Sequence, residues 1–170
     1  MQASTTVSVR RPSASTKHGP ISCAIRSSAT VGREYTRALI RDFANGSDVK
    51  LVGSARLAGF AEAELDGAPV ADDLIAQEIG PCFVDADGRR TDTVVLACTH
   101  YPLLLERLER LAPWPVTFVD PAPAIARRVV DLSGPKAADP PVSPARIVFT
   151  SKRSPSTALA AALARFGIGG

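Results

Sequence analysis

The chain has 170 residues, which is the size of one ordinary domain with or without tails. Its hydrophobic fraction of 45% is enough for one globular core, but its apolar stretches are too short or too rich in alanine to span a bilayer. The net charge of +3 is mild, and much of the excess comes from the N-terminal segment, so we expect neither nucleic acid nor a membrane as a partner.

The cysteines indicate a reducing environment and no metal. Cys23, Cys82 and Cys98 are far apart in the chain, and no Cys-x-x-Cys pair occurs. With only His18 and His100 as further soft ligands, the spacing argues against tetrahedral zinc, and we expect no bound metal. So few cysteines also argue against a disulfide scaffold, so we expect a cytoplasmic protein.

Residues 1–28 differ in composition from the rest of the chain. They are rich in Ser, Thr, Arg and Pro, no acidic residue precedes Glu34, and no helical or strand periodicity is visible. The composition is similar to that of an organellar transit peptide, but no amphipathic face and no apolar secretion-signal region occur. We predict a disordered or non-homologous leader over residues 1–28 and a folded lobe over residues 29–170.

The first part of this lobe predicts a helix, a strand and two further helices. The first helix ends at the turn pair Asn45-Gly46, and a short apolar run at 49–52 predicts the strand. The next helix stops near Gly67, and a surface turn follows at 85–88. The apolar helical positions are, in order, Tyr35, Leu39 and Phe43; Leu57, Phe60, Ala61 and Leu65; and Leu74, Ile75 and Ile79.

The second part alternates strands and helices. Apolar runs at 93–97 and 116–119 and the segment 146–150 predict three strands, of which the first is covered on both faces. Pro102 and Ser154-Pro155 suit helix starts, and Gly134-Pro135 ends the helix between them. The inward helical positions are Leu104, Leu108 and Leu111; Ile125, Val129 and Leu132; and Leu159, Leu163 and Phe166.

This alternation predicts an α/β fold in which a parallel sheet lies between helices, a three-layer domain. Ligands of such sheets bind beyond the carboxyl ends of the strands. The positions to search therefore directly follow Val52, Ala97 and Val119, and Cys98 is one of them.

The position of Cys98 suits acid–base chemistry. It lies between a strand and a helix start, where backbone N–H groups favour negative charge and a thiolate. Thr99 offers a hydroxyl, and His100 can give or take a proton. The residues alone leave two alternatives open, because a lone cysteine after an apolar strand also occurs as inert packing and a lone histidine as a capping group.

The run Ala97-Cys98-Thr99-His100-Tyr101-Pro102 resembles the second cysteine motif of the glutamate racemases, which belong to the aspartate/glutamate racemase superfamily. The preceding residues 91–96 and the following pair Leu103-Leu104 resemble the family as well. The similarity extends over roughly residues 29–167, with further matching segments at 29–31, 51–55, 119–129 and 149–151.

The resemblance implies one lobe of a two-lobed fold and a cofactor-independent, two-base interconversion of L- and D-glutamate that supplies peptidoglycan synthesis. It implies that Cys98 is the second catalytic cysteine, that His100 assists it and that Glu62 tunes that half of the site. It also implies substrate contacts from Thr99 and Thr30. From the residues alone, Glu62 is equally well a solvated carboxylate on a helix face.

Motifs from the first half of the family are missing. The chain contains no Asp-Ser-Gly-Val-Gly-Gly, Pro-Tyr-Gly or Cys-Asn-Thr-Ala run, and Cys23 lacks the neighbours of a first catalytic cysteine. Arg26 occupies a position where the resemblance implies a compact pocket wall. We therefore expect a C-terminal half without its N-terminal lobe, inactive alone, that forms a homodimer or pairs with a separate lobe.

Two other functions remain open from the sequence. The chain could belong to a relative that racemises aspartate or hydantoins, or it could be a partner-binding remnant without catalysis. A serine or cysteine hydrolase is disfavoured, because no Gly-x-Ser-x-Gly turn occurs and His100 is too near Cys98 in sequence to presume a triad. A dinucleotide or P-loop site is excluded by the lack of either glycine pattern.

Overall fold

The computed structural model describes residues 21–27, 34–44, 47–83, 85–86, 89–134, 147–150 and 153–168. Its strands are β1 (Ile21–Ser27), β2 (Asp48–Ser54), β3 (Asp85–Ala86), β4 (Arg89–Leu96) and β5 (Thr117–Val119). Its α-helices are α2 (Glu34–Phe43), α3 (Leu57–Leu65), α4 (Asp72–Ile79), α5 (Leu105–Leu111), α6 (Ala122–Ser133) and α7 (Thr157–Arg165). Two 3₁₀ helices, η1 (Gly80–Cys82) and η2 (Tyr101–Leu104), complete the described elements.

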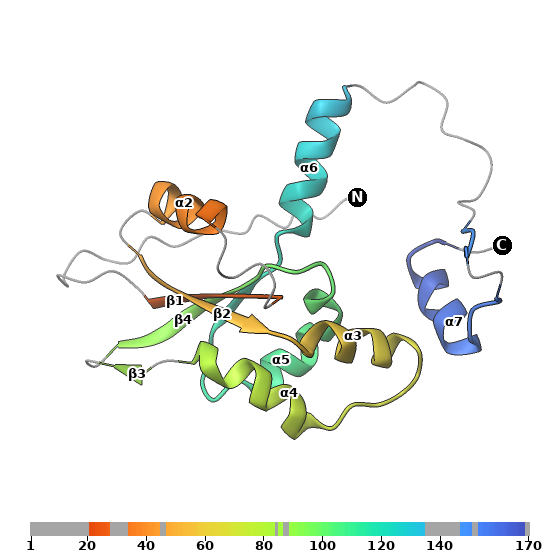
Figure 1. Ribbon diagram of the computed structural model, residues 1–170, viewed down its shortest axis with the longest axis horizontal. Coiled ribbons are helices and arrows are strands. Elements are labelled where there is room, and N and C mark those ends of the chain that lie inside the picture. Colours follow the sequence, from red (N-terminus) through yellow and green to blue (C-terminus); the bar gives the residue numbers. More distant parts are fainter. Residues whose placement is uncertain are drawn as a thin grey trace, which may run out of the picture.

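Four parallel strands form the sheet, in the order β2-β1-β4-β5, and β3 pairs antiparallel with the start of β4. The register aligns Ile25 of β1 with Val52 of β2 and with Leu96 of β4. Helix α2 lies on one side of the sheet, and α3, α4 and α5 lie on the other (Figure 1). The predicted α/β class with a parallel sheet is confirmed.

The segment Ile21–Ser27 corrects the predicted leader. It forms β1, which is hydrogen-bonded to β2 on one side and to β4 on the other. Ile21, Cys23 and Ile25 are buried and alternate with less buried residues, which is the period-two pattern of a strand. The prediction of a leader through residue 28 is therefore wrong for residues 21–27, while residues 1–20 lie outside the described part of the chain.

The main core fills the space between the sheet and the helices α3, α4 and α5. The predicted apolar faces of these helices are confirmed, because each contributes buried side chains: Leu57 and Ala61; Ile75 and Ile79; and Leu108. Gly67 follows α3 with a φ of 82°, and a Cβ at this position would lie 2.9 Å from the Cβ of Ala158. Glycine therefore serves both the turn and the close approach of α7.

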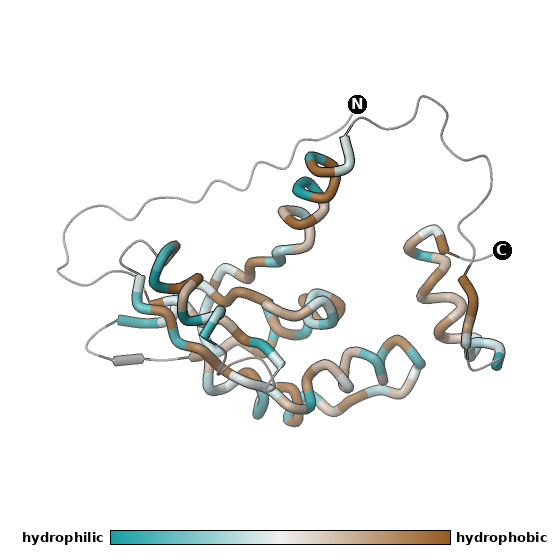
Figure 2. Tube along the Cα trace, turned by 45° about the horizontal axis from the view of Figure 1, so that its top comes forward, coloured by the Kyte–Doolittle hydropathy of each residue, from teal (hydrophilic) through white to brown (hydrophobic). Residues whose placement is uncertain are grey.

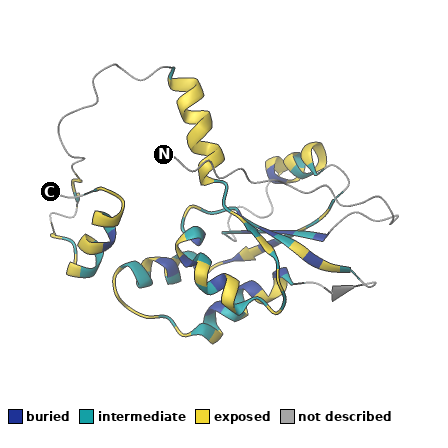
Figure 3. Cartoon of the chain, turned by 180° about the vertical axis from the view of Figure 1, so that it is seen from behind, coloured by how far each residue is buried: buried dark blue, intermediate teal, exposed yellow. Residues whose placement is uncertain are grey.

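Two predicted apolar faces are present but uncovered. Along α2, Tyr35 and Phe43 are each 71% exposed, and along α6, Ile125, Val129 and Leu132 are exposed as well. Figure 3 shows α6 exposed over its whole length, and Figure 2 shows apolar residues recurring along it. Helical periodicity identifies the apolar side of a helix, but it does not say what covers that side.

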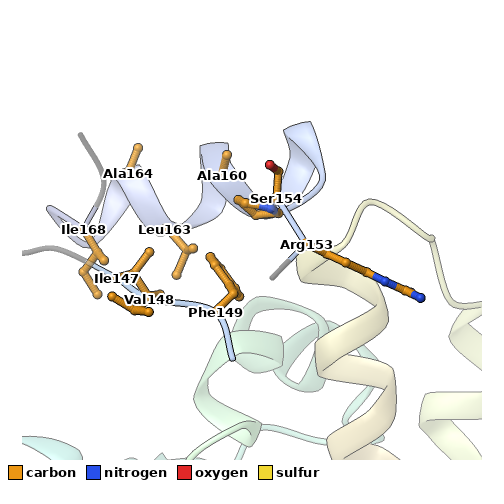
Figure 4. A pocket seen from close by; sticks show the side chains of 10 residues that line it. Ile147, Val148, Phe149, Arg153, Ser154, Ala160, Leu163, Ala164 and Ile168 are labelled. Atoms are coloured by element: carbon orange, nitrogen blue, oxygen red, sulfur yellow. The ribbon is translucent and has the colours of Figure 1, made fainter. Parts of the chain in front are cut away.

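The C-terminal region also differs from expectation. The described residues 147–150 are not a strand, and Phe166, which directly follows α7, is 61% exposed rather than inward. Helix α7 begins at Thr157, where the Ser156 hydroxyl accepts a hydrogen bond from Leu159 N and donates one to Asp66. Ile147, Val148 and Phe149 line an apolar pocket against α7, and Cys98 is not among the residues that line it (Figure 4). Within the described ranges, no helix combines the length and the apolar character needed to cross a membrane.

Candidate active site

The order of the strands in the sheet determines where the candidate site lies. From β1 the chain moves to β2 on one side, and later to β4 and β5 on the other, so the order reverses between β1 and β4. The carboxyl ends of the strands flanking such a reversal form the usual ligand crevice of open α/β sheets. Cys98 follows β4 here, after Ala97, whose N–H donates to the Ile25 carbonyl at 3.0 Å.

A tight turn carries the site residues. Tyr101 N–H donates to the Cys98 carbonyl at 3.3 Å, and η2 then leads into α5. The helix expected at Pro102 thus starts as a 3₁₀ turn. Cys98 is half-buried, and its Sγ lies 3.8 Å from His100 Nδ1. Thr99 Oγ1 lies 3.5 Å from the same nitrogen, so the two groups share one partner.

Glu62 reaches this turn from α3. Its Oε1 lies 3.2 Å from His100 Nε2, and the two side chains are 65% and 38% exposed. When the imidazole is neutral, a hydrogen bond to a carboxylate requires the proton on Nε2, which leaves Nδ1 as an acceptor facing the thiol. The order thiol, imidazole, carboxylate is the arrangement that allows a nucleophile or base to pass its proton to a neighbour.

The structure brings together four of the five predicted site residues, namely Cys98, Thr99, His100 and Glu62. The fifth, Thr30, lies outside the described residues. Arg26, expected at the pocket wall, donates from Nη1 to Thr36 Oγ1 of α2 at 2.6 Å.

The other two thiols lie in the core. Cys23 and Cys82 are both 0% exposed. Hydrogen bonding to Cys23 and burial raise the pKa of the Cys82 thiol above its ordinary value. Neither residue can meet a substrate at the Cys98 turn without unfolding of the core.

A polar network below the site was not predicted. Ser54, at the carboxyl end of β2, accepts a hydrogen bond from Leu57 N at 2.9 Å and donates one to Glu78 Oε2 at 2.5 Å. Arg56 donates to Glu78 Oε1 at 2.8 Å. Burial alone would raise the pKa of Glu78, but the hydrogen bonds from Ser54 and Arg56 outweigh it and lower the pKa. The only signal in the sequence was the position of Ser54, shortly after Val52.

Tyr101 lies beside this network with its side chain fully buried. Burial and, to a lesser extent, the nearby Cys98 together raise the pKa of the Tyr101 hydroxyl to about 12, although Ser54 acts in the opposite direction. The hydroxyl nevertheless forms no hydrogen bond of good geometry among the described residues. Within those residues, no group of three or more His, Cys, Asp or Glu side chains is placed to hold a metal ion.

Comparison with known proteins decides the family. A glutamate racemase of Brucella anthropi is 42% identical over 164 residues, covering 96% of this chain and 59% of the relative. Another from Agrobacterium fabrum is 48% identical over 147 residues, covering 86% of this chain and 54% of the relative. The chain belongs to the glutamate racemase family. It spans about half the length of the family members it matches.

A solved glutamate racemase supports the same assignment by shape. The crystal structure of the Escherichia coli enzyme, in complex with L-glutamate and the activator UDP-MurNAc-ala, matches with a TM-score of 0.70 and 35% identity. The match covers 87% of this chain and 55% of that structure. No family model matches the chain. The Brucella anthropi alignment takes in 96% of the chain, so it includes part of the segment that we expected to be a non-homologous leader.

Proposed function

We propose that this chain is the half of a glutamate racemase that carries the second catalytic cysteine. The full reaction interconverts L- and D-glutamate without a cofactor and supplies D-glutamate for peptidoglycan. The observation that carries the proposal is the contact of Cys98, His100 and Glu62 beyond the carboxyl end of β4. The Escherichia coli relative, which binds L-glutamate, supports a small amino acid as the ligand.

Cys98 is the base on one face of the substrate Cα. The thiol passes its proton to His100 Nδ1, Glu62 stabilises the resulting imidazolium, and the thiolate removes the Cα proton. The electron pair of the broken C–H bond then delocalises into the substrate carboxylate, whose negative charge must be held by hydrogen bonds. In the reverse direction the Cys98 thiol returns the proton to Cα.

Thr99 is the substrate-binding residue of this turn. Its side chain is exposed next to Cys98, so the hydroxyl can donate a hydrogen bond to a bound carboxylate. Thr30 is proposed as a second substrate contact from the resemblance alone.

Inversion needs an acid on the opposite face of Cα, and this chain has no second exposed thiol among its described residues. We expect no racemase turnover from the chain alone. The test is incubation with L-glutamate and, separately, with D-glutamate, followed by circular dichroism over hours. A steady loss of optical signal that disappears in Cys98→Ser would contradict this expectation, and Cys82→Ser serves as the matched control.

Partners and location follow from the same proposal. The exposed apolar residues of α2 and α6 favour a homodimer or pairing with a separate N-terminal lobe, and the free cysteines favour the cytoplasm. A racemase of aspartate or hydantoins and a non-catalytic, partner-binding remnant are the alternatives. Replacing glutamate by aspartate in the same assay tests for an aspartate racemase. Size-exclusion chromatography with an added N-terminal lobe tests for a partner-binding remnant.

A further inference from the structure

Arg107 of α5 joins three segments that are far apart in the sequence. Its guanidinium donates to Glu64 Oε1 of α3, to the Val70 carbonyl in the following loop at 2.6 Å, and to Asp72 Oδ1 of α4. The Arg107 side chain is only 20% exposed. A planar guanidinium with several bound acceptors holds its partners in direction as well as in distance.

The contact between Glu62 and His100 cannot set its own geometry. Both side chains are substantially exposed, at 65% and 38%. Exposed ion pairs contribute only about 0–1 kcal/mol, too little to fix two elements against each other. The relative position of α3 and the Cys98 turn must therefore be set by other contacts.

Apolar packing supplies part of that position. Leu57 and Ala61 of α3 share one core cluster with Tyr101, Leu104 and Leu108. Such packing is strong, but it has no direction and tolerates small shifts of a helix along its neighbour. A directional contact is needed to fix the side of α3 that faces the turn.

Arg107 provides a directional contact between the same two segments of the chain. Glu64 lies two residues after Glu62 on α3, and Arg107 lies seven residues after His100, where η2 has continued into α5. The two elements are thus joined by Glu62 to His100 at one point and by Glu64 to Arg107 at the other.

We propose that Arg107 is a positioning residue, which holds α3 so that Glu62 stays in contact with His100 and thereby sets the reactivity of Cys98. The inference rests on the proposed function only in taking Cys98 as the working thiol. Arg110 is the matched control, because it contacts Asp72 but not α3 and is 60% exposed.

The test is a double-mutant cycle on Cys98 alkylation in the full chain, with iodoacetamide as the reagent and mass spectrometry as the readout. Glu62→Gln and Arg107→Ala are each expected to change the rate constant in the same direction, by about two- to fivefold. The double variant should match Glu62→Gln alone, because both changes remove one coupled interaction. Arg110→Ala should react like the wild type.

Arg107→Lys separates positioning from general stability. Lysine keeps the charge but cannot bridge three acceptors, so it should restore the wild-type rate only in part. Cys23 and Cys82, both 0% exposed, report unfolding if they react. Should Arg107→Ala unfold, Glu64→Ala replaces it in the cycle with the same expectation.

Three results would overturn the proposal: a wild-type rate in Arg107→Ala, an unchanged rate in Glu62→Gln, or effects that multiply in the double variant. The assay contains no glutamate. A failure of the racemase proposal would therefore leave this result unaffected, and the two failures can be told apart.

Discussion

The Tyr101 side chain places a fully buried hydroxyl next to the Cys98 turn without a well-formed hydrogen bond among the described residues. Leaving a buried hydroxyl unpaired costs about 1–3 kcal/mol, so this position is not explained by stability. The Glu62–His100 pair differs from Tyr101 in being largely exposed, and an exposed ion pair contributes little to the free energy of folding. At the scale of single residues, the site therefore contains two polar features that contribute little to folding stability, a buried hydroxyl without a well-formed hydrogen bond and an exposed ion pair.

Tyr101→Phe tests this view. At neutral pH the variant should unfold with a free energy within about 1 kcal/mol of the wild type or above it, because the lost hydroxyl had no well-formed partner. Since the Tyr101 pKa is raised from 10.0 to about 12, the neutral form is favoured in the folded state, and this stabilisation is lost as pH rises through that interval. Urea titrations from neutral pH to about pH 11 should show the wild type losing about 1 kcal/mol more than the variant.

A loss of several kcal/mol in Tyr101→Phe at neutral pH would contradict the prediction, because it would mean that the hydroxyl is paired. The prediction would also be contradicted if the wild type and Tyr101→Phe lost the same amount of unfolding free energy at alkaline pH. Tyr35, which is 71% exposed on α2, provides the control substitution Tyr35→Phe, for which no difference is expected at either pH.

At the scale of secondary-structure elements, the Ser54–Glu78 hydrogen bond joins β2 to α4, and Ser54 also caps the first turn of α3. Arg56 donates a further hydrogen bond to Glu78, so Ser54, Arg56 and Glu78 form one polar network. The network holds the start of the helix that carries Glu62, so the geometry of the site depends on groups outside it.

Glu78→Gln should lower the free energy of unfolding by about 1 kcal/mol near neutral pH, because it removes a charged acceptor of two hydrogen bonds. The folded-state pKa of Glu78 is lowered, so this stabilisation is present above the ordinary value of 4.5 and is lost as pH falls through the lowered pKa. Urea titrations should therefore show the gap to the wild type closing in acid. Glu109→Gln, on the exposed side of α5, is the control, and a gap that does not depend on pH would contradict the prediction.

Much of the fold could be predicted from the periodicity of apolar residues. The elements that were predicted wrongly have physical explanations. The faces of α3, α4 and α5 follow the helical repeat because each packs on one continuous core. Strand β1 was missed because Ser22, Ala24 and Arg26 interrupt its apolar residues, although that alternation is itself a strand signal. The residues 147–150 have strand-like composition, but a strand needs a neighbour to pair with, and composition does not provide one.

In the candidate site, too, some residues could be predicted from the sequence and others could not. The Cys98 turn could be located because it directly follows a strand of a parallel sheet. The contact of Glu62 could be inferred only from the family resemblance, since 38 residues separate it from His100. Arg107 and Glu78 gave no signal, because a single charged residue on a helix normally faces solvent.

At the scale of the whole molecule, the described residues form an α/β fold on one parallel sheet, and Cys98 is a half-buried thiol beyond the carboxyl end of β4. It spans about half of the length of its relatives, and its exposed apolar helix faces remain without cover among the described residues. Under the proposed function, the described residues supply one base, Cys98, and no second exposed thiol to act as the acid on the opposite face. Such a site should remove and return a proton on one side of the substrate only.

Exchange of the glutamate Cα proton in deuterium oxide, followed by proton NMR, tests this claim most directly. We expect one enantiomer of glutamate to lose its Cα proton signal without inversion, and we expect Cys98→Ser to abolish the exchange while Cys82→Ser does not. Exchange of neither enantiomer, equal exchange of both, or exchange that persists in Cys98→Ser would contradict it.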